Sequence, residues 1–249
     1  MELLICGSWV RFPPGSPRLA SLDVACRNGL PYTDEDALLS RICHRAGDWI
    51  KRSAERRLLR LSLRRAGFDP DRPIVSYTTR EELAVLHALA SGCPEGARVL
   101  EIGSHLGASA VYLAAGLGQR QGRLYCVDTW KNDAMADGVS DTYADFCATT
   151  HGIKNITAIR KMSTALGPGD LPLPLHLVFI DADHSYPAVK ADFEHIEAWL
   201  ADDAIVAFHD TLAAKGVTRL VGEIMARPDF CPAGHVNNLT WLRKIPVLK

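Results

Sequence analysis

The chain has 249 residues, of which 47% are hydrophobic and 23% are charged, and its formal net charge is -1 at neutral pH. A chain of this composition can bury one sizeable core, which excludes a disordered or fibrous protein. The near-zero charge gives no reason to expect a nucleic-acid partner, and no run reaches the roughly 18 apolar residues that a membrane span needs.

The seven cysteines are odd in number, widely scattered and never arranged as C-x-x-C. This usage favours a reducing compartment over a disulfide framework or a zinc site. We therefore expect a cytoplasmic protein.

The first 74 residues differ in pattern from the rest of the chain. Residues 1–32 are rich in proline and glycine and have no hydrophobic period, so we expect them to be disordered or to reflect a start site assigned too far upstream. Residues 33–74 are predicted to be a helical extension, capped at Thr33 or Asp34 and basic from Lys51 to Arg65. The basic helix either covers the domain or pairs with a second copy in a homo-oligomer; contact with a membrane surface or nucleic acid is the alternative.

From residue 75 the chain alternates between strand and helix patterns. Helices are predicted at Glu81–Leu89, Ser109–Ala115, Thr142–Thr149, Pro187–Leu200 and Val217–Met225, and strands at Val99–Ile102, Arg123–Asp128, Ile156–Ile159, Leu175–Asp181, Ala204–Asp210 and Leu239–Leu242. The segments Lys131–Asp141 and Ala226–Asn238 are too irregular to assign. Strands separated by helices predict parallel pairing with right-handed crossovers, so the fold class is α/β, Rossmann-like and doubly wound.

Four of the predicted strands end on residues suited to ligand chemistry: Gly103, Asp128, Asp181 and the pair His209 and Asp210. Ligands of open parallel sheets bind outside the carboxyl ends of the strands, so these residues should converge on one crevice.

The first of these strands leads into the loop Glu101–Ser109, whose glycines are spaced G-x-x-x-G. The spacing differs from the G-x-G-x-x-G of dinucleotide folds and leaves room for a bulkier, cationic part of a ligand beside the Glu101 carboxylate. Asp128 is well placed to accept hydrogen bonds from two ribose hydroxyls, so the sequence predicts a nucleoside site.

These motifs resemble the class I S-adenosylmethionine-dependent methyltransferases. The segment Glu101–Val111 is similar to the first motif of the metal-dependent catechol and caffeoyl-CoA O-methyltransferases. Val127–Trp130 and Ile180–Tyr186 resemble more closely the bacterial enzymes that methylate sugars and antibiotics. The resemblance covers about residues 75 to 245 and implies a mostly parallel seven-stranded sheet with helices on both faces.

The resemblance also implies S-adenosylmethionine as the cofactor. Gly103 and His105 would line its methionine moiety, and Ser109 would bind its carboxylate. Asp128 would bind the ribose and Ser163 the adenine edge, while Trp130 either stacks on the adenine or packs against the edge of the sheet. The predicted cofactor-binding residues are Glu101, Gly103, His105, Gly107, Ser109, Asp128, Trp130 and Ser163.

Methyl transfer to a hydroxyl needs an oxygen nucleophile that is close to ionised and held in line. A divalent cation lowers the pKa of a chelated hydroxyl, and hard oxygen ligands suit Mg²⁺. The resemblance implies that Asp181, His209 and Asp210 hold this metal. The family usually has Glu, Asp or Asn where this chain has His209, and imidazole suits Mn²⁺ better than Mg²⁺. Asp183 could replace His209 as a ligand or could cap the following helix.

His184 matches the general base of the related enzymes, because a neutral imidazole can accept a proton at neutral pH. Its alternative role is to orient Asp181. With His184 and Asp181 as catalytic residues, the sequence predicts methyl transfer from S-adenosylmethionine to a hydroxyl of a small molecule, either a sugar or a natural-product scaffold. The alternatives are a catechol or hydroxycinnamoyl-type O-methyltransferase and a non-catalytic S-adenosylmethionine-binding module.

Overall fold

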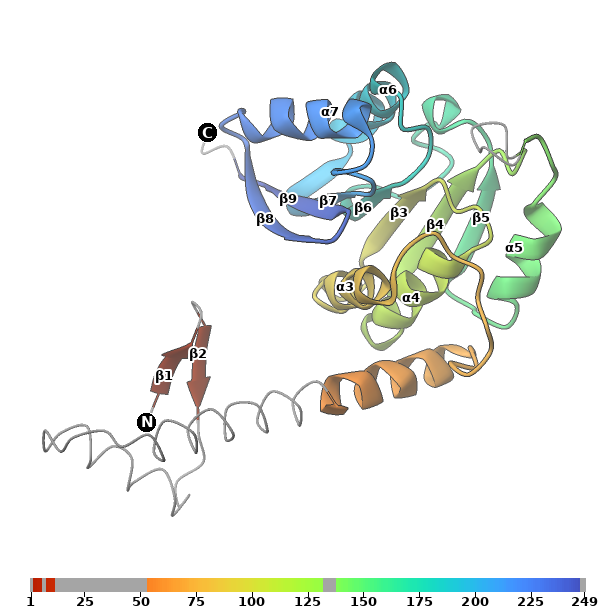
Figure 1. Cartoon of the computed structure of the whole chain (residues 1–249), viewed down its shortest axis with the longest axis vertical. Coiled ribbons are helices and arrows are strands. Elements are labelled where there is room, and N and C mark those ends of the chain that lie inside the picture. The colour runs from red at the N-terminus through yellow and green to blue at the C-terminus, as the bar shows by residue number, and fades with distance from the viewer. Residues whose placement is uncertain (1, 6–7, 12–52, 132–137, 247–249) are drawn as a thin grey trace, which may run out of the picture. The chain divides into compact units, whose positions relative to one another are not determined.

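The computed structural model describes residues 2–5, 8–11, 53–131 and 138–246, and the chain divides into two units between Ala54 and Glu55. In the first unit, β1 (Glu2–Ile5) and β2 (Ser8–Arg11) pair antiparallel (Figure 1). The predicted helix start at Thr33 lies outside the described residues. The predicted disorder of residues 1–32 lies largely outside them as well, and the predicted domain boundaries stay predictions.

The second unit is built around a seven-stranded sheet with the order β5-β4-β3-β6-β7-β9-β8 (Figure 1). Its strands are β3 (Arg98–Ile102), β4 (Arg123–Asp128), β5 (Ile156–Arg160), β6 (Leu175–Ile180), β7 (Leu200–Phe208), β8 (Phe230–Val236) and β9 (Leu239–Lys244). Strands β3 to β7 pair in parallel, and β9 runs antiparallel to both β7 and β8. This confirms the predicted Rossmann-like α/β fold with a mostly parallel sheet.

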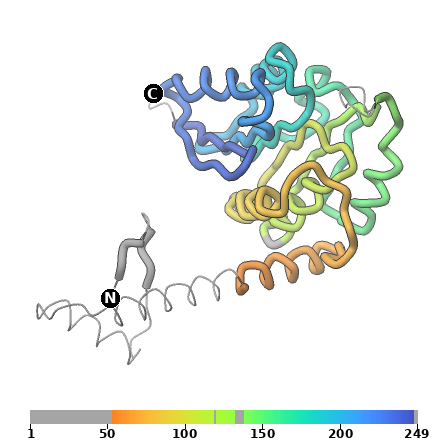
Figure 2. The backbone as a smooth tube through the Cα atoms, in the orientation of Figure 1, coloured from red at the N-terminus to blue at the C-terminus, as the bar shows by residue number. Residues whose placement is uncertain are grey.

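Helices cover both faces of the sheet, as the tube in Figure 2 shows. They are α3 (Arg80–Ser91), α4 (Ala108–Leu117), α5 (Tyr143–Thr150), α6 (Tyr186–Glu197) and α7 (Lys215–Met225), with 3-10 turns η1 (Gly118–Arg120) and η2 (Ser163–Ala165). Alternate strand residues point to opposite faces of a sheet. Val99 accordingly packs in the core under α3 and α4, whereas Leu100 and Ile102 pack in the second core with α6 and α7.

Residues 55–66 are helical and pack within the second unit. Leu63 is buried in the core beside α4, and the Ser62 hydroxyl donates to the carbonyl oxygen of Ala115 at 3.0 Å. The second unit begins at Glu55. It therefore contains residues 55–74, which the sequence pattern assigns to the helical extension. Within the described residues, no helix has both the length and the hydrophobicity that a membrane crossing requires.

The segment Ala226–Asn238, too irregular to assign from sequence, contains the edge strand β8. Its ladder with β9 is interrupted between Pro232 and Gly234, and proline is tolerated in sheets mainly on edge strands. A Cβ on Gly234 would lie 2.1 Å from the Trp241 ring of β9, so glycine is needed where the ring crosses the strand. Strand β7 also starts at Leu200, four residues before the predicted Ala204.

Candidate active site

The carboxyl ends of β4, β3, β6 and β7 meet along one edge of the sheet. Hydrogen bonds continue past the strand ends, from the Gly103 amide to the Val127 carbonyl oxygen at 2.9 Å and from the Asp181 amide to the Ile102 carbonyl oxygen at 2.9 Å. The His209 amide donates to the Ile180 carbonyl oxygen at 3.1 Å. The predicted convergence of these strand ends is confirmed.

The loop after β3 has a backbone that depends on glycine. Gly103, His105 and Gly107 have φ values of +85°, +42° and +87°, all in the left-handed region. A Cβ on Gly103 would lie 2.2 Å from the backbone carbonyl oxygen of Asp181, closer than any real contact of this kind. Gly103 therefore permits the close approach of the β3 loop to the end of β6.

Asp128 holds this loop in place. One carboxylate oxygen accepts hydrogen bonds from the Ser104 and His105 amides, both at 2.9 Å, and the other accepts from the Trp130 amide at 2.7 Å. A carboxylate offers about four lone-pair positions, so three amide donors leave acceptor capacity for a further donor.

Glu101 is a completely buried carboxylate beneath the same loop. One oxygen accepts from the Ser104 hydroxyl at 2.6 Å, and the other has no hydrogen-bond partner among the described residues. Burial raises the pKa of Glu101 to about 7, and the Ser109 and Cys126 side chains lie against it. Buried polar atoms almost always have partners, and the polar side chains that lie against this carboxylate besides Ser104 are Ser109 and Cys126.

Trp130 follows β4 and lies beneath the glycine loop. Its ring is fully buried, with centroids 4.9 Å from Tyr143 and 4.7 Å from Phe146, and its indole N–H donates to the His105 carbonyl oxygen at 2.9 Å. Both faces of the ring are covered, which favours the packing alternative, with the ring holding the loop against α5. Ser163 lies in η2 after β5, and its hydroxyl is hydrogen-bonded to Asp192 of α6.

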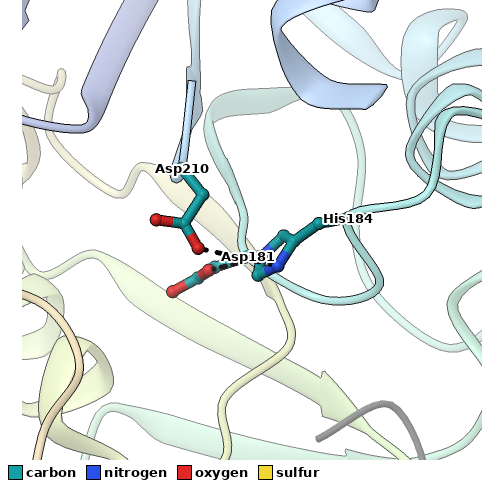
Figure 3. Close-up of side chains that lie close together, drawn as sticks. All are labelled: Asp181, His184 and Asp210. Carbon is teal, nitrogen blue, oxygen red and sulfur yellow. Dashed lines mark hydrogen bonds and ion pairs between the residues drawn. The ribbon is translucent and has the colours of Figure 1, made fainter. Parts of the chain in front are cut away.

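Asp181, His184 and Asp210 come together beyond β6 and β7 (Figure 3). His184 Nε2 lies 3.2 Å from an Asp181 carboxylate oxygen, and His184 Nδ1 lies 3.6 Å from an Asp210 carboxylate oxygen. Each of the three offers a ligand atom within 4.8 Å of the others, a spacing that one metal ion could bridge.

His209 lies next to this cluster and is only 4% exposed. Its Nδ1 is 3.3 Å from an Asp181 oxygen and 3.5 Å from an Asp210 oxygen, while its Nε2 is 3.3 Å from Glu82 Oε2. Burial would lower the pKa of His209, but the three carboxylates outweigh burial and raise it to about 9.

The electrostatics keep the Asp181 carboxylate of the cluster ionised. Burial alone would raise the pKa of Asp181, but hydrogen bonds from His184 and His209 outweigh it and lower the pKa to about 2. The Asp181 hydrogen bond in turn raises the pKa of His184.

Two further acidic residues, Asp183 and Glu82, lie close to the cluster in the sequence or in space. The Asp183 carboxylate accepts from the Ser185 amide at 2.8 Å in a local turn before α6; the N-cap of α6 is Ser185, so this bond does not cap the helix. Glu82 is absent from the sequence-predicted site because its only local signal is the capping box that it forms with Thr79 at the start of α3.

Comparison with known proteins gives matches of three kinds. Residues 100–211 match a family described as a methyltransferase domain. The chain is 29% identical over 158 residues to the uncharacterized protein y4gI of Sinorhizobium fredii (strain NBRC 101917 / NGR234), an alignment that covers 59% of this chain and 17% of that protein. The chain thus spans less than a fifth of the length of that curated relative.

Two solved structures share the fold over most of their length. The O-methyltransferase of Bacillus cereus, solved with SAH, is 15% identical with a TM-score of 0.53, covering 91% of this chain and 97% of that one. The O-methyltransferase TomG of Streptomyces achromogenes, solved with SAM, is 20% identical with a TM-score of 0.52, covering 91% of this chain and 96% of that one.

Proposed function

We propose that this chain, whose residues 100–211 match a methyltransferase domain, is a class I S-adenosylmethionine-dependent methyltransferase that transfers a methyl group to a hydroxyl of a small molecule. The observation that carries the proposal is the shared edge of the sheet. The buried Glu101 carboxylate and the Asp128 carboxylate both hold the glycine loop, and Asp181 of the Asp181, His184 and Asp210 cluster lies against Gly103 of that loop.

The donor half of the site fits S-adenosylmethionine, which when bound supplies a methyl group on a sulfonium centre. The Glu101 carboxylate lies beneath the glycine loop and, when ionised, favours a cationic part of the donor at that loop through the low-dielectric interior, without direct contact. Asp128 has acceptor capacity left for ribose hydroxyls, and Gly103 lets the loop backbone approach the ligand closely.

Asp181 and Asp210 of the cluster would hold a divalent metal in the acceptor half, with the neighbouring His209 as third ligand and His184, the remaining member of the cluster, left as the base. Two carboxylates and the Nδ1 atom of His209, 3.3 and 3.5 Å from their oxygens, form a mixed oxygen and nitrogen donor set, which favours Mn²⁺ over Mg²⁺. When bound, the ion acts as a Lewis acid that lowers the pKa of the acceptor hydroxyl.

His184 is the base in this proposal. It is 36% exposed, against 4% for His209, so it is the imidazole that an acceptor can reach. The acceptor hydroxyl gives its proton to a His184 ring nitrogen, the acceptor oxygen bonds to the methyl carbon, and the carbon–sulfur bond breaks to leave a neutral thioether. Asp181, hydrogen-bonded to His184 at 3.2 Å, stabilises the imidazolium that forms.

The rim of the site favours an acceptor with an apolar scaffold. Tyr77 is 64% exposed, and the centroid of its ring lies 5.9 Å from that of the His105 ring of the glycine loop. TomG, which shares the fold, is involved in tomaymycin synthesis. We therefore put natural-product scaffolds with neighbouring oxygens ahead of simple sugars.

The test is turnover by the full chain after removal of metal with a chelator. Catechols, hydroxycinnamoyl thioesters, sugars and polycyclic phenols are offered with S-adenosylmethionine and either Mn²⁺ or Mg²⁺, and S-adenosylhomocysteine and methylated product are measured together. We expect metal-dependent methylation of at least one acceptor with adjacent oxygens, lost in His184→Ala. Tight cofactor binding without turnover of any acceptor would instead support a non-catalytic binding module.

A further inference from the structure

Glu82 is a buried carboxylate that joins three separate segments of the chain. Its side chain is 1% exposed. Oε2 accepts from the Thr79 amide at 2.7 Å and from the Thr79 hydroxyl at 2.9 Å, and Oε1 accepts from the Asn238 amide at 2.8 Å. The fourth contact, 3.3 Å from Oε2, is Nε2 of His209, which lies 127 residues further along the chain.

Capping the helix does not account for this arrangement. A capping box needs only the reciprocal contacts with Thr79, which glutamine makes as well as glutamate. Burial of a carboxylate is costly unless it is paired, and the buried imidazole of His209 is the ionisable partner that Glu82 meets.

The contact also decides which way the His209 ring points. With Nε2 donating to Glu82, the other ring nitrogen, Nδ1, faces the oxygens of Asp181 and Asp210 at 3.3 and 3.5 Å. Histidines that bind metals commonly donate their second ring N–H to a carboxylate, which fixes both the tautomer and the ring orientation.

We propose that Glu82 is a positioning residue that, by accepting a hydrogen bond from Nε2 of His209, holds Nδ1 of that imidazole toward the site formed with Asp181 and Asp210. The inference rests on the proposed metal-assisted function. Glu82 touches neither donor nor acceptor and acts only through His209.

The test is binding of Mn²⁺ alone to the full chain, monitored by the loss of the free-ion electron paramagnetic resonance signal. Loss of an outer partner of a metal ligand typically weakens metal binding by about 10- to 100-fold, so we expect a shift of that size in Glu82→Gln. The matched control is Thr79→Ala, which breaks the capping box but leaves the Glu82 contact with His209, and it should bind Mn²⁺ as the wild type does.

A double-mutant cycle separates positioning from independent effects. If Glu82 acts through His209, then His209→Gln alone weakens Mn²⁺ binding, and adding Glu82→Gln causes no further loss. Should Glu82→Gln not fold, Glu82→Asp keeps a favourable negative charge in the first turn of α3 but withdraws the carboxylate from His209, and the same loss is expected.

Three results would overturn the inference while leaving the proposed function intact: wild-type affinity in the Glu82 variants, an equal loss in Thr79→Ala, or additive losses in the double variant. Absence of Mn²⁺ binding by the wild type would overturn the metal-assisted function and this inference together. Folding of each variant is checked by its thermal unfolding curve.

Discussion

Replacement of Gly103 by alanine tests how closely the glycine loop and the end of β6 are held together. Gly103 has φ +85°, and an L-residue in the left-handed region costs about 1–2 kcal/mol. The new Cβ would also lie 2.2 Å from the carbonyl oxygen and 2.6 Å from the carbonyl carbon of Asp181. These are backbone atoms that cannot rotate away, so the two strands must separate, and overpacking of this kind costs about 1–3 kcal/mol.

The two effects together lower the free energy of unfolding by about 2–5 kcal/mol. At about 2–4 °C per kcal/mol for a domain of this size, the melting temperature should fall by about 4–20 °C. Because Gly103 and Asp181 belong to the donor and acceptor halves of the site, binding of S-adenosylhomocysteine should weaken as well.

The assay is thermal unfolding by calorimetry, with Gly96→Ala as the matched control. Gly96 has φ +66° but would place its Cβ with no heavy atom within 4 Å, so that variant carries the backbone cost of about 1–2 kcal/mol alone. Equal melting temperatures for the two variants, with unchanged ligand binding by Gly103→Ala, would refute the reasoning.

Three other substitutions and the removal of metal probe the rest of the site. Asp128→Asn removes charge from a group that accepts three loop amides, so calorimetry should show S-adenosylhomocysteine binding weakened about tenfold or more, and unchanged affinity would count against a ribose role. Burial raises the pKa of Glu101 from 4.5 to about 7, so its ionisation destabilises the fold as the pH rises through that window. Glu101→Gln should therefore raise the melting temperature at pH 8 but not at pH 4. A melting-temperature difference that does not change with pH would contradict this. Trp130→Phe removes the hydrogen bond from the indole N–H to the His105 carbonyl oxygen and should lower the melting temperature. A loss of ligand affinity without a loss of stability would instead support the alternative role of Trp130, stacking on the adenine. Chelation of divalent metal should abolish turnover, with Mn²⁺ restoring it at lower concentration than Mg²⁺, and full activity in chelator would exclude the metal.

The order of most strands and helices from residue 75 could be predicted because apolar runs with the period of a strand alternate with segments that have the period of a helix. Strand β8 could not, since Pro232 and Gly234 break its local pattern and its pairing depends on Trp241 of β9. The packing of residues 55–66 could not be predicted either. Leu58 and Leu63 are the same residue type in the same helical segment, yet only Leu63 is buried.

The part of the candidate site that depends only on strand topology could be predicted from the sequence. Parallel strands bring their carboxyl ends together, so the positions of Gly103, Asp128 and Asp181 at strand ends suffice to group them. The contact of Glu82 with His209 could not be predicted, since it joins the start of a helix to a strand 127 residues away. Trp130 was ambiguous for a related reason: only the neighbouring rings of α5 decide whether its faces are open.

The central claim is that the edge of the sheet at Gly103 and Asp128 binds S-adenosylmethionine. The most direct test is calorimetric titration of S-adenosylhomocysteine into the full chain and into Asp128→Asn. We predict saturable binding with one ligand per chain, weakened in the variant. No binding to the wild-type chain would contradict the claim, because a methyltransferase must hold the product of its donor at this site.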